Sequence, residues 1–238
     1  MHGIITKERK IKMKIGMIVA VMDEINAMLS EMGEPIETIT ADGFDIRRYS
    51  VSGNDLYVAK SGAGEIYASA ATQLLISKYG VRLIVNFGIC GGLTPKMSLC
   101  RTCVVEKVIH YDYDVSAIDG TEMGRYSDLP DVYIAADQKL IELAVSVMPE
   151  LERVICASAD KFVADPDKKT ELHNRFGASI CEMESAGILL TANRCGVPAL
   201  LIKAVSDSVS GGAEEFAKMA CESARVCVRT MMAVIERI

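Results

Sequence analysis

Three acidic residues, far apart along the chain, are the strongest candidates for catalysis. Glu24 follows one apolar stretch, Glu184 precedes a helix-like segment, and Asp207 comes after another apolar stretch. Each carboxyl group alone is more often a solvated surface acid or a helix cap. Functional groups of α/β folds, however, gather beyond the carboxyl ends of the strands, so all three are expected at one edge of a sheet. Two carboxyl groups on opposite sides of a glycosidic bond can supply acid and base catalysis together.

The segment from Cys181 to Asp207 indicates how two of these acids are positioned. An apolar helix-like run follows Glu184, Gly196-Val197-Pro198 interrupts it, and Ala199 to Ile202 is apolar at consecutive positions. Such a short apolar run is typical of a strand that is buried on both faces of a parallel sheet. Asp207 is therefore expected just beyond the end of a buried strand, and Glu184 just before the helix that packs on it.

The rest of the chain alternates between strand-like and helix-like segments. Strands are expected at residues 14–21, 44–50, 55–60, 81–87, 104–109, 154–158 and 178–181. Helices are expected at residues 25–32, 65–79, 137–147, 167–175 and 213–237. Residues 88–92 are expected to form a glycine-rich turn, where a ligand can approach the backbone closely. The alternation predicts a single α/β domain with a largely parallel central sheet that is covered on both faces.

Composition limits the possible functions. The chain has 238 residues, half of them hydrophobic, and a net charge of −6. Nucleic-acid binding usually needs a basic face, so it is not favoured, and no apolar run reaches the roughly 18 residues that span a membrane. Residues 1–12 are interpreted as an N-terminal extension of a domain over residues 13–238, because the apolar run at 15–22 has no signal-peptide cleavage site. A cytoplasmic protein is expected.

The eight cysteines are expected to be free thiols. Most of them lie inside apolar runs, where a thiol behaves as a small hydrophobic group. Cys100 and Cys103 form one C-x-x-C motif, but a single pair without a second Cys or His pair is a weak zinc signal. We interpret both residues as the start of a strand and expect no metal.

The sequence lacks the motifs of several common enzyme classes. Ser61-Gly62-Ala63-Gly64 lacks the third glycine of a dinucleotide-binding fingerprint, and a tight turn into a helix explains its two glycines. The chain has no G-x-S-x-G motif for a serine nucleophile, and neither an H-E-x-x-H motif nor a P-loop. No cofactor is expected.

Several stretches, in a consistent order, resemble the purine nucleoside phosphorylase superfamily, and most of all its 5′-methylthioadenosine/S-adenosylhomocysteine nucleosidase branch. These stretches are Met13–Gly16 with Glu24, Ser61–Gly64, Gly88–Leu93, Asp112–Val115, Ser158–Phe162, Glu182–Glu184 and Ala204–Asp207. The resemblance covers almost all of residues 13–230. It implies a three-layer αβα sandwich with a central mixed, largely parallel sheet. It also implies a homodimer whose sites lie near the subunit interface.

The resemblance implies a role for each candidate residue. Glu24 would activate water against the anomeric carbon, and Asp207, with Ser206 beside it, would protonate the purine. Glu184 would hold the ribose 2′- and 3′-hydroxyls. The other implied binding residues are Met183 at the sugar, Phe162 and the Val163 backbone at adenine, and Val21 and Phe216 at the 5′-substituent.

The chemistry of the N-glycosidic bond is consistent with these roles. The bond breaks through an oxocarbenium-like state, so the base must not leave as an anion. A buried carboxyl such as Asp207 can keep its proton well above the reference pKa of about 4 and donate it to the base. A carboxylate such as Glu184 can accept both hydrogen bonds of a vicinal diol.

Hydrolysis is expected rather than phosphorolysis. The places of the phosphate-binding arginines of the superfamily's phosphorylases are occupied here by Met22-Asp23-Glu24 and by Asn86-Phe87, and a carboxylate repels phosphate. A phosphate-dependent phosphorylase and a non-catalytic nucleoside-binding protein stay as alternatives. Ile89 stands where the nucleosidases usually carry serine, Cys90 replaces an alanine, and Lys203 an arginine. A different nucleoside, such as futalosine, is therefore a further alternative.

Overall fold

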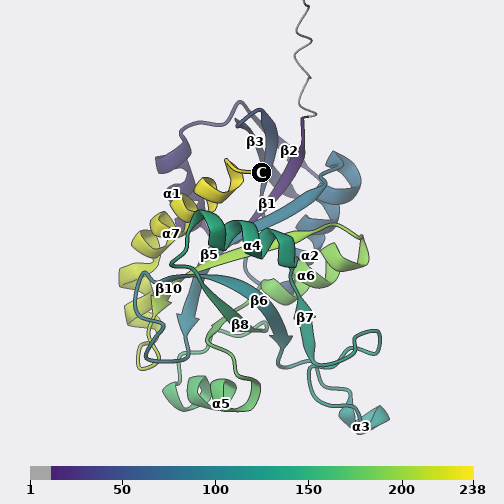
Figure 1. Ribbon diagram of the computed structural model, residues 1–238, viewed down its shortest axis with the longest axis vertical. Helices are drawn as coiled ribbons and strands as arrows, with labels where there is room; N and C mark the ends of the chain where they lie inside the picture. Colours follow the sequence, from purple (N-terminus) through teal and green to yellow (C-terminus); the bar gives the residue numbers. More distant parts are fainter. Residues whose placement is uncertain (1–11) are drawn as a thin grey trace, which may run out of the picture.

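Four parallel strands form the centre of the molecule, which the computed structural model describes for residues 12–238 (Figure 1). Their order is β4 (Asn54–Lys60), β1 (Lys14–Val19), β5 (Leu83–Gly92) and β10 (Ala199–Asp207). Every residue of β5 and β10 is buried, as expected of strands that are covered on both faces. The carboxyl ends of β5 and β10 consequently lie side by side, with Asp207 paired with Gly91.

Beyond β10 the strands close a circuit back to β5. β10 pairs antiparallel with β6 (Thr102–His110), which pairs in parallel with β8 (Glu152–Ser158). β8 then pairs with the short β9 (Ile180–Glu182), whose other side pairs with β5. This arrangement brings the segment before Glu184 next to the end of β5, although about 90 residues separate them in sequence.

At the other side of the sheet, a hairpin extends it outward from β4. The strands predicted at residues 44–50 and 55–60 are confirmed as β3 (Phe44–Val51) and β4, which form a hairpin that turns at Ser52 and Gly53 with positive φ values of 50° and 86°. Two edge strands were not predicted: β2 (Glu37–Ala41), which pairs with β3, and β7 (Tyr133–Ala135), which pairs with β6. Both are short, with five and three residues, and neither contains four consecutive apolar residues.

Helices cover both faces of the sheet, so the predicted three-layer α/β class is confirmed. One layer consists of α1 (Met22–Met32), α4 (Gln138–Val147) and α7 (Ala213–Ile235). The other consists of α2 (Glu65–Leu74), continued by a π-helical segment (Leu75–Tyr79), and α6 (Ser185–Arg194). The short α3 (Ser116–Asp119) and α5 (Pro166–Phe176) lie at the end of the molecule that is lowest in Figure 1.

The amphipathic pattern of α7 explains why this long helix packs along the sheet. Its fully buried side chains include Ala224, Cys227, Val228 and Met231, which recur at the three- and four-residue spacing of one helix face. They contact β10 and β5, so α7 covers the strand that ends at Asp207 and the strand that pairs with it.

The glycine-rich turn predicted at residues 88–92 is wrong, because these residues continue β5. The glycines of this stretch are needed for close packing and do not form a turn. A Cβ atom on Gly88 would come within 2.9 Å of a Glu24 carboxylate oxygen, and one on Gly91 within 3.1 Å of an Asp207 oxygen. The strand therefore needs glycine where the acids press against it.

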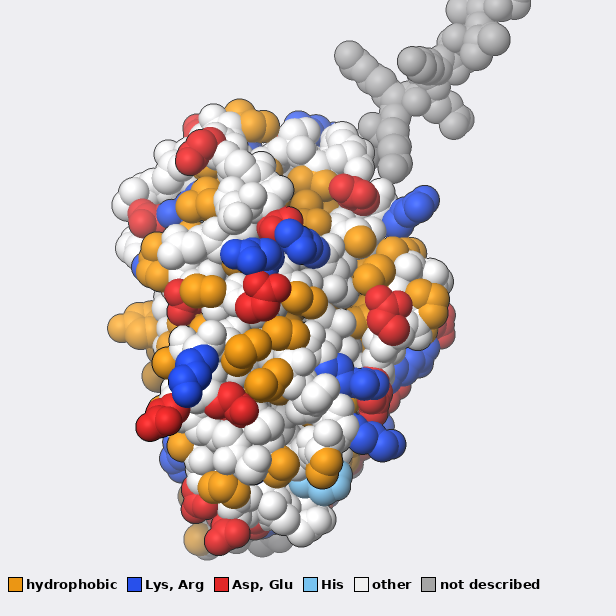
Figure 2. Space-filling view, turned by 90° about the vertical axis from the view of Figure 1, so that its left-hand side faces the viewer, with side chains coloured by type: hydrophobic (Ala, Val, Ile, Leu, Met, Phe, Trp, Pro, Cys, Tyr) orange, Lys and Arg blue, Asp and Glu red, His pale blue; other side chains and the backbone are white. Residues whose placement is uncertain are grey.

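The face formed by α1 and α7 carries charges of both signs, interspersed with single hydrophobic side chains (Figure 2). Glu31 of α1 pairs there with Arg229 at 2.8 Å and with Arg225 at 3.9 Å, both from α7. This face offers no continuous basic surface of the kind that nucleic acids bind.

No helix among residues 12–238 has the length and apolar character needed to cross a lipid bilayer. The predicted N-terminal extension at residues 1–12 falls almost wholly outside the described residues. Its separation from a single domain over residues 13–238 stays a prediction.

Candidate active site

One cavity of about 150 Å³ is lined by nine of the ten residues predicted for the site. The nine are Val21, Glu24, Ile89, Phe162, Met183, Glu184, Ser206, Asp207 and Phe216. Val163 does not line the cavity but is buried directly beside Phe162. The three acids named first in the sequence therefore open onto a common space, to which β5, β9, β10, α1 and α7 all contribute.

Glu24 is held in place by backbone N–H groups from two elements. Its Oε2 accepts hydrogen bonds from Ala20 and Val21 at 2.9 and 3.0 Å, and its Oε1 accepts one from Ile89 at 3.0 Å. Burial raises the pKa of Glu24, and these hydrogen bonds and nearby Lys203 oppose that rise only in part. A buried carboxylate with a raised pKa is suited to accept a proton near neutral pH.

Glu184 lies at the start of α6, where its Oε1 accepts a hydrogen bond of 2.9 Å from the N–H of Gly64. Burial, together with the neighbouring carboxylate of Glu182, raises the pKa of Glu184 to about 8. The positive φ of Gly64, 107°, lets the chain turn its N–H toward this carboxyl group. The turn that the sequence predicted at residues 61–64 thus fixes an acid 120 residues away.

A buried ion pair lies behind Glu184. Lys203 Nζ is 2.8 Å from Glu182 Oε2, and both side chains are almost fully buried. Glu182 also accepts hydrogen bonds from the N–H groups of Glu184 and Ser185 at the start of α6. Although burial acts in the opposite direction, Lys203 lowers the pKa of Glu182 and keeps it ionised. The pair thereby anchors the peptide that carries Glu184.

Another buried carboxyl group, that of Glu65, links α2 to α6. Its Oε2 accepts a hydrogen bond of 2.5 Å from the N–H of Gly187 in α6, and its Oε1 forms a short hydrogen bond with the Ser158 hydroxyl. Burial and, next, the charge of Glu182 raise the pKa of Glu65 to about 8. Glu65 is therefore largely protonated near neutral pH, which lets it lie close to a second acid.

Asp207 ends β10 and is fixed on both of its oxygens. Ser206 Oγ lies 2.9 Å from Oδ1, and Lys169 Nζ lies 2.5 Å from Oδ2. Lys169 belongs to α5 and its side chain is completely buried, as is that of Asp207. The arrangement presents one carboxyl group to the cavity with a cation directly behind it.

Two aromatic side chains bound the outer side of the cavity. The rings of Phe162 and Phe216 meet edge to face, with centroids 5.3 Å apart. Phe162 is nevertheless 47% exposed, so one of its sides is free. Pockets for small-molecule ligands usually measure about 300–1,000 Å³, so a nucleoside-sized ligand requires this cavity to widen.

Several residues at the site were missed by the sequence analysis. Glu182, Cys181 and Gly91 line the cavity, and Lys169 contacts it through Asp207. Glu182 had a signal, since it stands two positions before Glu184 and at the end of a short strand. Lys169 had none: it lies in the polar run Asp-Lys-Lys-Thr-Glu, which is typical of a solvated helix face.

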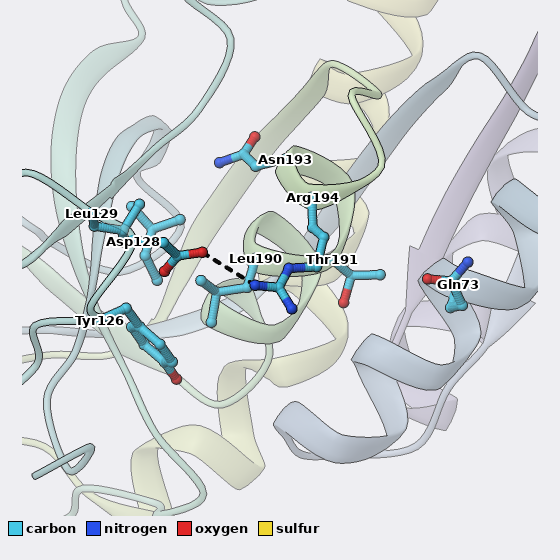
Figure 3. Close-up of a pocket in the computed structure, with 9 residues that line it drawn as sticks. Gln73, Tyr126, Asp128, Leu129, Leu190, Thr191, Asn193 and Arg194 are labelled. Atoms are coloured by element: carbon cyan, nitrogen blue, oxygen red, sulfur yellow. Dashed lines mark hydrogen bonds and ion pairs between the residues drawn. The ribbon is translucent and has the colours of Figure 1, made fainter. Parts of the chain in front are cut away.

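A larger hollow of about 500 Å³ lies between the ends of α2 and α6 and the segment before β7 (Figure 3). Its charged groups are Asp128 and Arg194, which form an ion pair of 3.2 Å. Both are mostly exposed, at 59% and 80%, and none of the predicted acids reaches this hollow. Exposed ion pairs are screened by water, so the smaller cavity is the better candidate for catalysis.

The combination of a mixed α/β sandwich and buried acids at the ends of its strands matches one known class of protein. Residues 14–238 match the family model described as the phosphorylase superfamily. The chain belongs to the phosphorylase superfamily, as the resemblance of its motifs predicted.

Two individual relatives are similar to most of this chain. A 5′-methylthioadenosine/S-adenosylhomocysteine nucleosidase of Tolumonas auensis is 32% identical over 231 residues, covering 92% of this chain and 99% of the relative. The protein of the same description from Shewanella halifaxensis is 35% identical over 205 residues, covering 83% of this chain and 87% of the relative.

Solved structures agree on the fold. The native futalosine hydrolase of Helicobacter pylori has a TM-score of 0.90 at 25% identity, covering 95% of this chain and 98% of its own. A 5′-methylthioadenosine/S-adenosylhomocysteine nucleosidase of Helicobacter pylori, solved with butyl-thio-DADMe-Immucillin-A, has a TM-score of 0.91 at 24% identity. It covers 96% of this chain and 100% of its own.

Proposed function

We propose that this chain is a nucleosidase that hydrolyses the N-glycosidic bond of 5′-methylthioadenosine and S-adenosylhomocysteine and releases adenine. The observation that carries the proposal is that Glu24, Glu184 and Asp207 line one cavity. Relatives that bear this description and cover most of the chain support the choice of substrates. Such an enzyme would act in methionine salvage.

Glu24 acts as the general base in this proposal. A water molecule attacks the anomeric carbon and forms the new C–O bond, while one of its protons passes to the carboxylate of Glu24. Three backbone N–H groups hold that carboxylate at a fixed position, so it needs no rearrangement when the water arrives.

Asp207 acts as the general acid. The C–N bond breaks, its electron pair moves into the purine, and a proton from Asp207 reaches the imidazole ring of the base. Ser206, whose hydroxyl lies 2.9 Å from Asp207 Oδ1, orients the carboxyl group. Water and nucleoside are consumed, and free adenine and the thio-sugar are formed.

The remaining residues bind the substrate. Glu184 accepts hydrogen bonds from the ribose 2′- and 3′-hydroxyls, and Met183 packs on the sugar. Phe162 stacks on adenine, and the backbone of Val163 contacts the edge of the base. Val21, Ile89 and Phe216 line the pocket for the 5′-substituent.

Hydrolysis is favoured over phosphorolysis by the charge of the cavity. Among residues 12–238, the lining includes the acids Glu24, Glu182, Glu184 and Asp207 and no arginine or lysine. An inorganic phosphate entering this space would approach the carboxylates of Glu24 and Glu182 without a cation in the lining to bind it. Water carries no charge and meets no such barrier.

The test is adenine release from each nucleoside, with and without phosphate. We expect adenine to appear at the same rate in phosphate-free buffer and in added phosphate, with the free thio-sugar as the second product. Strict dependence on phosphate, with a sugar 1-phosphate as product, would assign the chain to the phosphorylases. Tight binding of an adenosine analogue without turnover would indicate a non-catalytic binding protein.

Futalosine is a second candidate substrate. Ile89 and Cys90 replace the serine and alanine that are usual in the nucleosidases, and a futalosine hydrolase is among the proteins with the same fold. A side-by-side comparison of kcat/KM for futalosine and 5′-methylthioadenosine decides between them. A preference for futalosine would change the substrate and leave the roles of the acids as proposed.

We also infer a cytoplasmic homodimer. Ile66 and Tyr67, at the start of α2, are 76% and 60% exposed, and they adjoin Gly64, which binds Glu184. A second subunit on this apolar face would lie beside the active site. Light scattering after size exclusion measures the oligomeric state, and Ile66→Glu is expected to yield monomers, whereas the exposed Arg194→Glu is not.

A further inference from the structure

Lys169 is the cation most directly tied to the proposed acid, and no step described so far uses it. Its ammonium group has three acceptors: Asp207 Oδ2 at 2.5 Å, the Ser208 carbonyl at 2.6 Å and the Gly211 carbonyl at 3.0 Å. An ammonium group has three protons, so every donor is used. The preceding residue, Lys168, differs completely, because it is exposed and pairs with Glu171 on the helix surface.

The burial of Lys169 needs a reason beyond stability. Its side chain is 0% exposed and Asp207 is 1% exposed. A buried ion pair of this kind is often no more stabilising than a pair of apolar side chains of the same volume. Fold stability alone therefore does not explain why the buried face of α5, which otherwise carries Leu172 and Phe176, also carries a lysine that contacts Asp207.

The other groups around Asp207 supply no positive charge. Ser206 adjoins it on β10, Gly91 leaves space for its Oδ2 on β5, and Cys181 faces it from β9. The pKa of the Cys181 thiol is raised to about 12, chiefly by burial, so this thiol is neutral. Among the described residues that contact the Asp207 carboxyl group, Lys169 is thus the cation.

We propose that Lys169 is a positioning residue that acts through Asp207 on the departure of the base. In the free protein Asp207 pairs with Lys169 as a carboxylate. In the proposed reaction Asp207 carries the proton that the base takes up, and negative charge returns to its two oxygens as that proton leaves. The Lys169 ammonium group already lies against one of them, so this charge is stabilised as it forms. Its bonds to Ser208 and Gly211 also hold the segment after β10 in the position that this contact requires.

The inference rests on the proposed function and concerns one half of that reaction. It predicts that Lys169 matters only when the leaving group needs a proton. Adenine needs one, whereas p-nitrophenolate is stable as an anion and departs without help. The ratio of the two activities therefore isolates the contribution of Lys169 from general effects on folding or binding.

The experiment compares wild type, Lys169→Met and the neighbouring control Lys168→Met on 5′-methylthioadenosine and on p-nitrophenyl β-D-ribofuranoside. We expect Lys169→Met to lower kcat/KM for the nucleoside by about 10²–10³-fold, the loss typical of removing one transition-state charge contact, and to leave the second substrate within a few fold. Lys168→Met should match wild type on both. Equal losses on both substrates would reduce Lys169 to a structural role and overturn the inference.

A second measurement covers the case in which Lys169→Met does not fold or wild type does not cleave the p-nitrophenyl substrate. Asp207→Asn/Lys169→Met removes both buried charges, so it leaves neither unpaired. If Lys169 acts only through Asp207, this double variant and Asp207→Asn have the same activity on 5′-methylthioadenosine. A further loss in the double variant contradicts the inference. Absence of adenine release by wild type would instead contradict the proposed function.

Discussion

At the scale of single residues, Asp207 is the group on which leaving-group protonation depends. We predict that Asp207→Asn lowers kcat for adenine release by about 10²–10⁴-fold, the usual contribution of a general acid, and preserves the fold. Because the change leaves Lys169 buried without its carboxylate, it should also lower the free energy of unfolding, by up to about 3–5 kcal/mol. Single-turnover kinetics and urea unfolding measure the two effects. Turnover at the wild-type rate would remove Asp207 from the mechanism.

Glu24 gives a prediction about pH. A general base works only when it is ionised, and the pKa of Glu24 is raised above the ordinary value of 4.5 by burial. As the pH falls through this raised pKa, Glu24 takes up a proton and activity is lost. The acid limb of the kcat/KM profile should therefore lie above pH 4.5.

The control for this profile is Glu24→Gln, which cannot ionise and should be nearly inactive at every pH. A wild-type profile that stays flat down to pH 4.5 would show that Glu24 is not the group whose ionisation limits the reaction.

At the scale of elements, Glu65 links the start of α2 to the start of α6 and gives a prediction about stability. Its pKa in the folded protein, about 8, is above the ordinary 4.5. The fold therefore favours the protonated form. Its contribution to stability is fully present below pH 4.5 and is lost as the pH rises through about 8.

We expect Glu65→Gln, which resembles the protonated form at every pH, to lose less stability than wild type between pH 6 and pH 9. The difference should be on the order of 2–3 kcal/mol, since the pH rises by about two units from 6 to the folded pKa of about 8 and each unit corresponds to about 1.4 kcal/mol. Urea unfolding at the two pH values measures it, with the exposed Glu142→Gln of α4 as control. Identical pH dependence of Glu65→Gln and wild type would mean that Glu65 is ionised throughout.

Close contact between α2 and α6 gives a second prediction at this scale. A Cβ atom on Gly187 would lie 2.5 Å from the Glu65 carbonyl oxygen and 2.5 Å from Ser69 Oγ. Gly187→Ala should therefore force the helices apart and destabilise the protein by about 1–3 kcal/mol, despite the better helix propensity of alanine. Thermal unfolding measures this cost, and Arg194→Ala, exposed on the same helix, should change little. An unchanged melting temperature for Gly187→Ala would indicate that the two helices can separate freely.

For the whole molecule, the eight cysteines test the fold directly. All are free; Cys195 and Cys221 are exposed, Cys100 is partly buried, and the other five are buried. A thiol reagent should label Cys195 first and Cys221 more slowly, because a hydrogen bond from its thiol to Asp23 raises the pKa of Cys221. The five buried thiols should react only after unfolding. Rapid labelling of all eight in the native protein would contradict this arrangement.

How far the sequence predicts this molecule depends on whether a residue's role leaves a local pattern. Local patterns in the sequence predicted the buried strands β1, β5 and β10 and the turn at Gly64. Local position also marked three acids as candidates for the site: Glu24, Glu184 and Asp207. These patterns, together with the resemblance of the motifs, were enough to predict the fold class and to predict that the three acids lie together.

Other features depend on partners that are distant in sequence. Lys169 looks like a surface residue until α5 is placed against Asp207, and Glu65 looks like an ordinary helix-start acid until Ser158 and Gly187 surround it. The glycines of β5 were misread for the same reason. Glycine predicts a turn locally, and only the positions of Glu24 and Asp207 explain why a straight strand needs it.

That glycine-containing end of β5 has a consequence for how substrate range could diverge among related enzymes. Larger residues at 88 and 91 would displace the acids themselves, so these positions offer little freedom for change. Ile89 and Cys90, between them, both face the cavity. New specificities could arise there without disturbing the groups that break the bond.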